Sequence, residues 1–181
     1  MFSLHETRGG VHPPQCKDTR DFACTSITPP AKVRIPLNMH IGRPASPVVH
    51  EGDHVYIGTL IGDVEGMGSP IHASVSGTVT SVATEQLPTG QQAPVVEIAS
   101  DGKMEADPAL KPPTYATKDE FIACVRDSGM VGLGGASFPT WFKMRVPAGK
   151  KFEFLIVNGM ECEPYITSDY RQMMEHADRV V

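Results

Sequence analysis

Two short segments in the second half of the chain carry residue types that suit ligand binding. The first, Gly132–Lys143, reads GLGGASFPTWFK and contains three glycines followed by one cation. Closely spaced glycines let a backbone approach a flat ligand, and backbone N–H groups suit a phosphate or the edge of a flavin. The run is not a P-loop, since no Gly-Lys-Ser/Thr ends it, and it is a poor dinucleotide fingerprint. Taken alone, it suits a structural turn as well as a cofactor loop.

The second segment, Val157–Tyr165, reads VNGMECEPY and places two carboxylates and an amide in one loop. The segment Phe152–Val157 leads into this loop and is predicted to be a buried strand. Ligands of open α/β sheets bind at the carboxyl ends of strands, so the loop is a candidate binding loop. A solvated acidic turn is the alternative.

The elements that must position these two loops are predicted to be helical. Thr117–Glu120 has the pattern of a capping box and predicts a helix start, and Gly129 suits its end. Thr167 or Ser168 is expected to cap a last helix that carries Met173, Met174, Ala177 and Val180. This order of a helix, a loop, a strand, a loop and a helix is typical of α/β domains, but one strand cannot form a parallel sheet. Residues 115–181 are therefore expected to be the N-terminal part of a larger α/β domain.

The first half has the sequence pattern of a β domain, with short strands predicted at 33–37, 54–57, 74–79 and 94–98. The chain has 17 glycines and 16 prolines, which favours many turns over a helical bundle. Composition divides it into a lead-in (1–30), a β domain (31–100), a linker (101–114) and the α/β part. The fold class expected is α+β, with a small β barrel-sandwich followed by the beginning of an α/β domain.

The β region resembles the lipoyl- and biotinyl-carrier family through Val49–Val55, Gly58–Gly62 and Pro70–Val79. Carriers present a lysine at a hairpin tip, which here corresponds to Glu65–Ser69. Because no lysine lies between Lys32 and Lys103, the fold is expected without the covalent carrier function.

Charge and hydrophobicity exclude two classes of partner. The chain has 16 basic and 21 acidic side chains, so it has no basic excess for nucleic acid. Its longest strongly apolar run, Phe154–Val157, is far short of the roughly 20 residues that a spanning helix needs. Direct membrane insertion is therefore not expected, and neither is a signal peptide. The fragment is expected to be soluble.

Cysteine and histidine spacing predicts no metal site. Cys16, Cys24, Cys124 and Cys162 form no C-x-x-C pair and are predicted to be free thiols. His40 and His72 are expected to make local hydrogen bonds. Trp141 is expected either to pack on the glycine loop or to mark a partner contact.

The two loops together resemble a known flavoprotein family. GLGGASFPT..K followed by VNG.ECEPY is similar to the flavin- and NADH-binding module of the respiratory complex I flavoprotein. The similarity is closer to the family of C subunits of bacterial Rnf electron-transport complexes. The segments GGVHPP, PLNMHIGRPASPVV and SPIHASVSGTV also resemble the N-terminal β domain of that family.

The resemblance implies a set of cofactor-binding residues and no catalytic residue. The set is Gly132, Gly134, Gly135, Lys143, Asn158, Glu161 and Glu163. The backbone at the glycines would lie along FMN, and Lys143 would lie at its polar end. The Asn158 amide would hydrogen-bond to the flavin or its ribityl chain. The two glutamates would line the space where NAD(H) stacks. Met160 and Cys162 depart from the complex I relatives, which have an acid and a serine there.

The resemblance also implies the activity of the parent protein, a ferredoxin:NAD+ oxidoreductase coupled to ion translocation. Electrons would pass between NAD(H), FMN and 4Fe-4S clusters held in the family's C-terminal part. Partners would be the other subunits and, through the complex, a ferredoxin-type carrier. The protein would lie peripherally on the cytoplasmic face of the bacterial plasma membrane, and this fragment alone would be inactive.

Two other functions remain open at this point. The chain could be a non-catalytic module that docks other subunits. It could also belong to another flavin reductase, such as the cobalamin-reducing or proline-reductase-associated proteins, which share the glycine loop and the ECEP motif.

Overall fold

The computed structural model describes residues 13–133, 135–147 and 149–180, which form two compact units. The β unit is Ile27–Glu153. The terminal unit combines the described residues up to Ser26 with those from Phe154 on. Each unit is described by itself.

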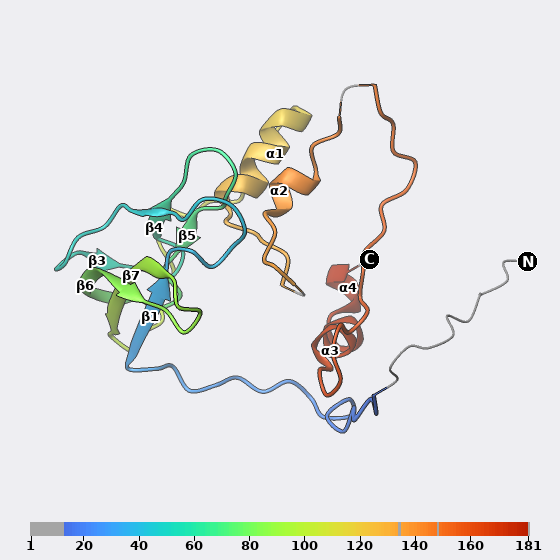
Figure 1. The fold of residues 1–181 in the computed structure, drawn as a ribbon, viewed down its shortest axis with the longest axis horizontal. Coiled ribbons are helices and arrows are strands. Elements are labelled where there is room, and N and C mark those ends of the chain that lie inside the picture. The colour runs from blue at the N-terminus through green and yellow to red at the C-terminus, as the bar shows by residue number, and fades with distance from the viewer. Residues whose placement is uncertain (1–12, 134, 148, 181) are drawn as a thin grey trace, which may run out of the picture. The chain divides into compact units, whose positions relative to one another are not determined.

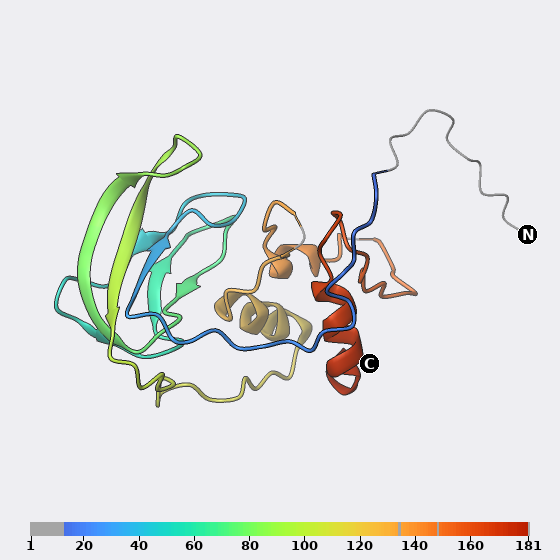
Figure 2. The same ribbon diagram turned by 90° about the horizontal axis from the view of Figure 1, so that it is seen from below.

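The β unit contains two antiparallel sheets (Figure 1). The four-stranded sheet has the order β1-β7-β6-β3, with β1 at Lys32–Pro36, β7 at Gln92–Ser100, β6 at Gly77–Gln86 and β3 at His54–Val55. The three-stranded sheet has the order β2-β4-β5, with β2 at Ser46–Pro47, β4 at Leu60–Asp63 and β5 at Ile71–His72. Figure 2 shows β6 and β7 as a long, curved hairpin.

Both sheets contribute to one apolar core. Ile61 of β4 is fully buried together with Val96 and Ile98 of β7. Val96 and Ile98 are two positions apart, so their side chains point to the same face of the strand, as period-two alternation requires. The core confirms the predicted barrel-sandwich.

The predicted strand at 74–79 begins only at Gly77, which has a φ of +154°. A Cβ atom at this position would collide with the carbonyl oxygen of Ala99 on β7. The close approach of β6 and β7 therefore requires a glycine. The predicted strand at 54–57 is also shorter in the structure, where only His54 and Val55 pair with β6.

The first half of the predicted linker lies against the β strands. The buried hydroxyl of Ser76 donates a 2.7 Å hydrogen bond to Asp101, and the backbone N–H of Glu105 donates to the same hydroxyl. Ile57 and Glu105 are joined by a backbone bond of 2.9 Å. Residues 101–105 thus add hydrogen bonds to the sandwich, while the compositional division into domains stays a prediction.

Helix α1, Lys118–Asp127, confirms the predicted capping box. Thr117 accepts a hydrogen bond from the N–H of Glu120, and the Glu120 carboxylate accepts one from the N–H of Thr117. The bonds that the carboxylate accepts from the N–H groups of Ala116 and Thr117 hold the pKa of Glu120 below its usual value. Gly129 follows the helix at a φ of +72°, which suits a helix end.

The predicted buried strand at 152–157 is wrong for this structure. These residues form no strand, and the Leu155 side chain is 90% exposed. A strand forms by pairing, and the described residues of the terminal unit pair no other strand with it. The apolar sequence alone therefore does not produce the element.

The last predicted helix is divided in two. Helix α3 is Ser168–Glu175 and helix α4 is Ala177–Val180, with a break at His176. Neither helix buries a residue. Across the described part of the chain, no helix is long and apolar enough to cross a membrane.

Candidate cofactor site

Backbone pairing closes the glycine-rich loop at its base. Val131 and Pro139 form an antiparallel bridge, and the N–H of Gly132 donates to the carbonyl oxygen of Phe138 at 2.9 Å. The short helix α2, Thr140–Lys143, follows directly. Leu133, near the tip of the loop, is 91% exposed. The loop is thus paired at its base and exposed to solvent at Leu133. Gly134 lies outside the described residues.

Lys143 lies over the beginning of this loop. A Cβ atom at Gly132 would lie 2.7 Å from the Lys143 ammonium, which is 5.9 Å from the centre of the Phe138 ring. A side chain at position 132 would therefore have to displace the cation. At Gly135 a Cβ atom would meet nothing within 4 Å. Bare backbone beside a cation suits a phosphate-bearing, flat ligand, so this half of the site fits FMN.

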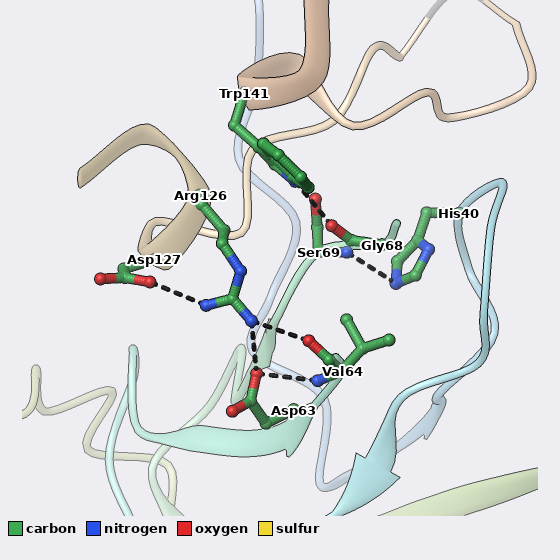
Figure 3. A network of polar contacts seen from close by, with 8 residues as sticks. All are labelled: His40, Asp63, Val64, Gly68, Ser69, Arg126, Asp127 and Trp141. Atoms are coloured by element: carbon green, nitrogen blue, oxygen red, sulfur yellow. Dashed lines mark hydrogen bonds and ion pairs between the residues drawn. The ribbon is translucent and has the colours of Figure 1, made fainter. Parts of the chain in front are cut away.

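The β4–β5 turn, residues 64–70, holds the helices on both sides of the loop (Figure 3). The indole N–H of Trp141, which is 4% exposed, donates to the carbonyl oxygen of Gly68 at 2.7 Å. Arg126 of α1 donates to the carbonyl oxygen of Val64 at 2.7 Å. Trp141 is thus bound to the β4–β5 turn, while its predicted packing on the glycine loop stays a prediction.

Arg126 is also paired with two carboxylates, those of Asp63 at 3.3 Å and Asp127 at 3.0 Å. The guanidinium has five N–H donors in a fixed fork, which matches several acceptors at once. The β4–β5 turn corresponds to the hairpin tip that carries the lysine in lipoyl and biotinyl carriers. In this chain the turn accepts hydrogen bonds from α1 and α2 instead.

A third contact reaches the loop from the segment after β1. The imidazole Nε2 of His40 accepts a hydrogen bond from the N–H of Ser69 at 3.2 Å, which confirms its predicted structural role. The N–H of the next residue, Ile41, donates to the carbonyl oxygen of Ser137 in the glycine loop at 3.4 Å. The two consecutive residues His40 and Ile41 therefore contact the β4–β5 turn and the loop, respectively.

His72 on β5 lies against the end of α1. Its Nδ1 would be 3.0 Å from a Cβ atom at Gly129. Burial lowers the pKa of His72, although the carboxylates of Asp127 and Asp63 act in the opposite direction. The structure gives its ring no hydrogen bond among the described residues, so the predicted local bond is not found. Its environment favours the neutral imidazole.

In the terminal unit, Asn158 and Glu161 are engaged locally. The Asn158 side-chain oxygen accepts from the N–H of Met160 at 2.9 Å. The Glu161 carboxylate accepts from the N–H of Tyr170, in the first turn of α3, at 3.0 Å. A carboxylate is stabilising there because it satisfies an unpaired N–H and faces the positive end of the helix.

Glu161 thus provides the hydrogen bond that was predicted for Thr167 or Ser168. Thr167 is the N-cap residue, but its side chain makes no capping bond. Its hydroxyl is 2.7 Å from the hydroxyl of Thr19. Competition from a residue 148 positions away explains why the local capping pattern was misleading.

Glu163 has an exposed side chain, and its carbonyl oxygen accepts from the Lys17 ammonium at 2.8 Å. Lys17 and Glu161 also line one cavity of about 210 Å³, together with Arg20, Thr167 and Tyr170. The sequence analysis missed Lys17, since a contact across 146 residues leaves no local pattern. The predicted residues fall into two groups, Gly132, Gly135 and Lys143 in the β unit and Asn158, Glu161 and Glu163 in the terminal unit. That they form one site stays a prediction.

All four cysteines are free thiols, as predicted. The part of the chain that the structure describes contains no group of three or more His, Cys, Asp or Glu side chains that could hold a metal ion.

Comparison with known protein families matches the first half of the chain to one domain and the last part to another. Residues 5–103, more than half of the chain, match the RnfC barrel sandwich hybrid domain. The chain belongs to the RnfC family. Residues 125–181 of this RnfC-family chain match the Nuo51 FMN-binding domain. The second match includes the glycine loop, Lys143 and the VNGMECEPY loop.

Curated relatives share both parts. The chain is 41% identical over 181 residues to the C subunit of the Na(+)-translocating ferredoxin:NAD(+) oxidoreductase complex of Acetobacterium woodii, a match that covers 96% of this chain and 40% of the relative. It is 40% identical to the C subunit of the proton-translocating complex of Clostridium ljungdahlii, covering 98% and 40%. It is 38% identical to the C subunit of the ion-translocating oxidoreductase complex of Rhodobacter capsulatus, covering 96% and 34%. The chain therefore spans two fifths or less of these relatives' lengths.

Proposed function

We propose that this chain supplies the N-terminal β domain and the first part of the FMN- and NADH-binding domain of an RnfC protein. The parent would act as an ion-translocating ferredoxin:NAD+ oxidoreductase. The names of the relatives and the order of the two domain matches support this function. The observation that carries it is the Lys143 ammonium over the side-chain-free backbone of Gly132.

The proposed roles follow the chemistry of each group. Backbone at Gly132, Gly134 and Gly135 passes along FMN, and Lys143 balances the charge of its phosphate end. Bound FMN would accept two electrons as a hydride and release them singly. This chain's own residues contribute placement and electrostatics, while iron–sulfur clusters belong to the remainder of the parent.

The acidic loop supplies the other proposed contacts. Asn158 hydrogen-bonds the flavin or its ribityl chain, and Glu161 and Glu163 line the space for NAD(H). Two carboxylates favour a nicotinamide that is cationic when oxidised. Further partners of the parent are the other subunits of the complex and a ferredoxin-type carrier, at the cytoplasmic face of the plasma membrane.

A flavin-fluorescence titration of the purified chain with FMN tests the proposal. Saturable quenching that Lys143→Ala weakens about tenfold, the usual loss for one charge-assisted contact, is the expected result. Lys111→Ala is the matched control, because this exposed lysine lies in the predicted linker. Equal affinities for the wild type and Lys143→Ala would contradict the assigned role of Lys143.

A second candidate function is an interaction module that docks other subunits without a cofactor. The exposed apolar run favours it, since the side chains of Phe154, Leu155 and Ile156 are all more than 80% exposed. Contiguous exposed apolar surface marks a place that another structure covers. Saturable quenching in the same titration would favour the cofactor function, because an interaction module would not quench flavin fluorescence.

A further inference from the structure

Lys17 joins both sides of the turn that carries the two glutamates. Its ammonium donates to the carbonyl oxygen of Glu163 at 2.8 Å and to that of Ile166 at 2.7 Å. These carbonyl groups belong to the ECEP turn, defined here as residues 161–166. A compact ammonium with three donors can satisfy two carbonyl groups at once, and charge-assisted bonds are stronger than neutral ones.

The turn that Lys17 bridges has an unfavourable backbone conformation. Tyr165 has a φ of +69°, in the left-handed region that costs a non-glycine residue free energy. Its N–H donates to the carbonyl oxygen of Gln15 at 2.9 Å. Cys16, between Gln15 and Lys17, also has a positive φ, +49°. Such conformations persist only where surrounding contacts hold them, and here each segment holds the other.

The following residues of the N-terminal segment run along α3, as both views show (Figures 1 and 2). The N–H of Cys24 donates to the Glu175 carboxylate at 2.9 Å, and Arg171 donates to the carbonyl oxygen of Arg20 at 2.9 Å. The hydrogen bond between Tyr170 and Glu161 then connects α3 back to the ECEP turn. Lys17 is therefore part of a continuous set of contacts around Glu161.

We propose that Lys17 is a positioning residue for the cofactor site. By bridging Glu163 and Ile166, it holds the ECEP turn in the conformation that presents the two glutamates. This inference rests on the proposed function, which assigns Glu161 and Glu163 to the space for NAD(H) and Asn158 of the same loop to the flavin. Residues 15–17 thereby act together with the acidic loop at 157–165, although they precede the β domain in sequence.

Three variants of the whole chain test this role: Lys17→Met, Lys17→Arg and the control Lys111→Met. The first readout is amide hydrogen exchange of peptides that cover residues 161–168. Lys17→Met is expected to exchange about tenfold faster there, since the contacts that close the turn are lost. Lys17→Arg should retain the protection because its guanidinium can reach two carbonyl oxygens. The control should match the wild type.

The second readout is FMN affinity, measured by fluorescence titration of the same variants. Lys17→Met should weaken binding about tenfold, and Lys17→Arg should recover most of it. Faster exchange with unchanged FMN affinity would overturn the positioning role, leaving a structural one. Unchanged exchange with weaker FMN binding would also overturn it, because Lys17 would then be a direct ligand.

The exchange readout keeps this inference separate from the proposed function. If the wild-type chain bound no FMN, the proposed function would fail for this chain by its own test. The role of Lys17 would then be decided by exchange alone. Lost protection in Lys17→Met with recovery in Lys17→Arg would support its hold on the ECEP turn, and equal protection in all variants would overturn it.

Discussion

Trp141 and Gly68 are joined by a 2.7 Å hydrogen bond between residues that lie 73 positions apart in the chain. Trp141 belongs to α2, which directly follows the glycine loop, and Gly68 belongs to the β4–β5 turn. The turn that carries a modified lysine in carrier proteins is therefore a fixed support for the loop in this chain. Within the β unit, this hydrogen bond connects the strands of the sandwich to the helix that follows the glycine loop.

We expect Trp141→Phe to lower the free energy of unfolding of the β unit by about 1–3 kcal/mol. An aromatic ring is retained, but the buried carbonyl oxygen of Gly68 loses its donor. Urea denaturation followed by far-UV circular dichroism measures the effect, since the variant lacks the chain's one tryptophan. Phe142→Leu, at the exposed neighbour, is the control. An unchanged midpoint for Trp141→Phe would show that the bond contributes nothing.

Gly77→Ala should destabilise the sandwich by about 2–4 kcal/mol, because the new Cβ collides with β7 backbone. Gly90→Ala is the matched comparison. Gly90 also has a positive φ, +83°, but a Cβ there meets nothing within 4 Å. Its cost should therefore be the conformational strain alone, about 1 kcal/mol. Thermal unfolding of both variants distinguishes collision from strain, and equal melting temperatures would contradict the collision.

Stability of the β unit should decrease as the pH falls through the ordinary titration range of histidine, about 6.5. Burial lowers the pKa of His72 in the folded chain, so the unfolded chain binds the proton first. Stability contributed by the neutral imidazole is therefore present above the unfolded pKa and lost below it. Urea midpoints between pH 8 and pH 5 should fall less steeply in His72→Gln than in the wild type. A slope that is the same in His72→Gln and the wild type would assign the effect to other groups.

Gly132→Ala should weaken FMN binding with little loss of stability. The added Cβ meets the far end of a flexible side chain, the Lys143 ammonium, which can move away. Gly135→Ala meets no atom of the chain itself, so any loss of affinity there reports contact with the ligand. Fluorescence titration and thermal unfolding of both variants measure the two effects. Full affinity in both would show that FMN does not pass this backbone.

Elements whose information is local could be predicted from the sequence. The capping box from Thr117 to Glu120 and the stop at Gly129 need only neighbouring residues, and the structure contains both. The strand around Ile35 was equally readable, because its pattern of buried side chains repeats every two residues. In β7 the adjacent Val95 and Val96 are both buried, so the apolar run was the signal there.

Elements that depend on distant partners could not be predicted. The apolar run at 152–157 looks like a strand, but pairing decides whether one forms. Lys17 hydrogen-bonds to Glu163, 146 residues away. The Thr167 hydroxyl is bonded to Thr19, so Glu161 accepts the hydrogen bond at the start of α3 instead. The candidate site was recognisable from its two motifs, whereas the residues that hold the acidic loop were not.

The contacts of Lys17 also constrain the order in which the chain assembles. The terminal unit is built from both ends of the described chain, with the whole β unit inserted between them. Residues 15–24 precede the β unit in the sequence, whereas their partners at 163–175 follow it. Closing so long a loop is less costly in entropy once the intervening residues are folded, because the flexible length is shorter. The sandwich would therefore fold before the terminal unit closes, and residues 15–24 would reach their native partners only after the β unit has formed.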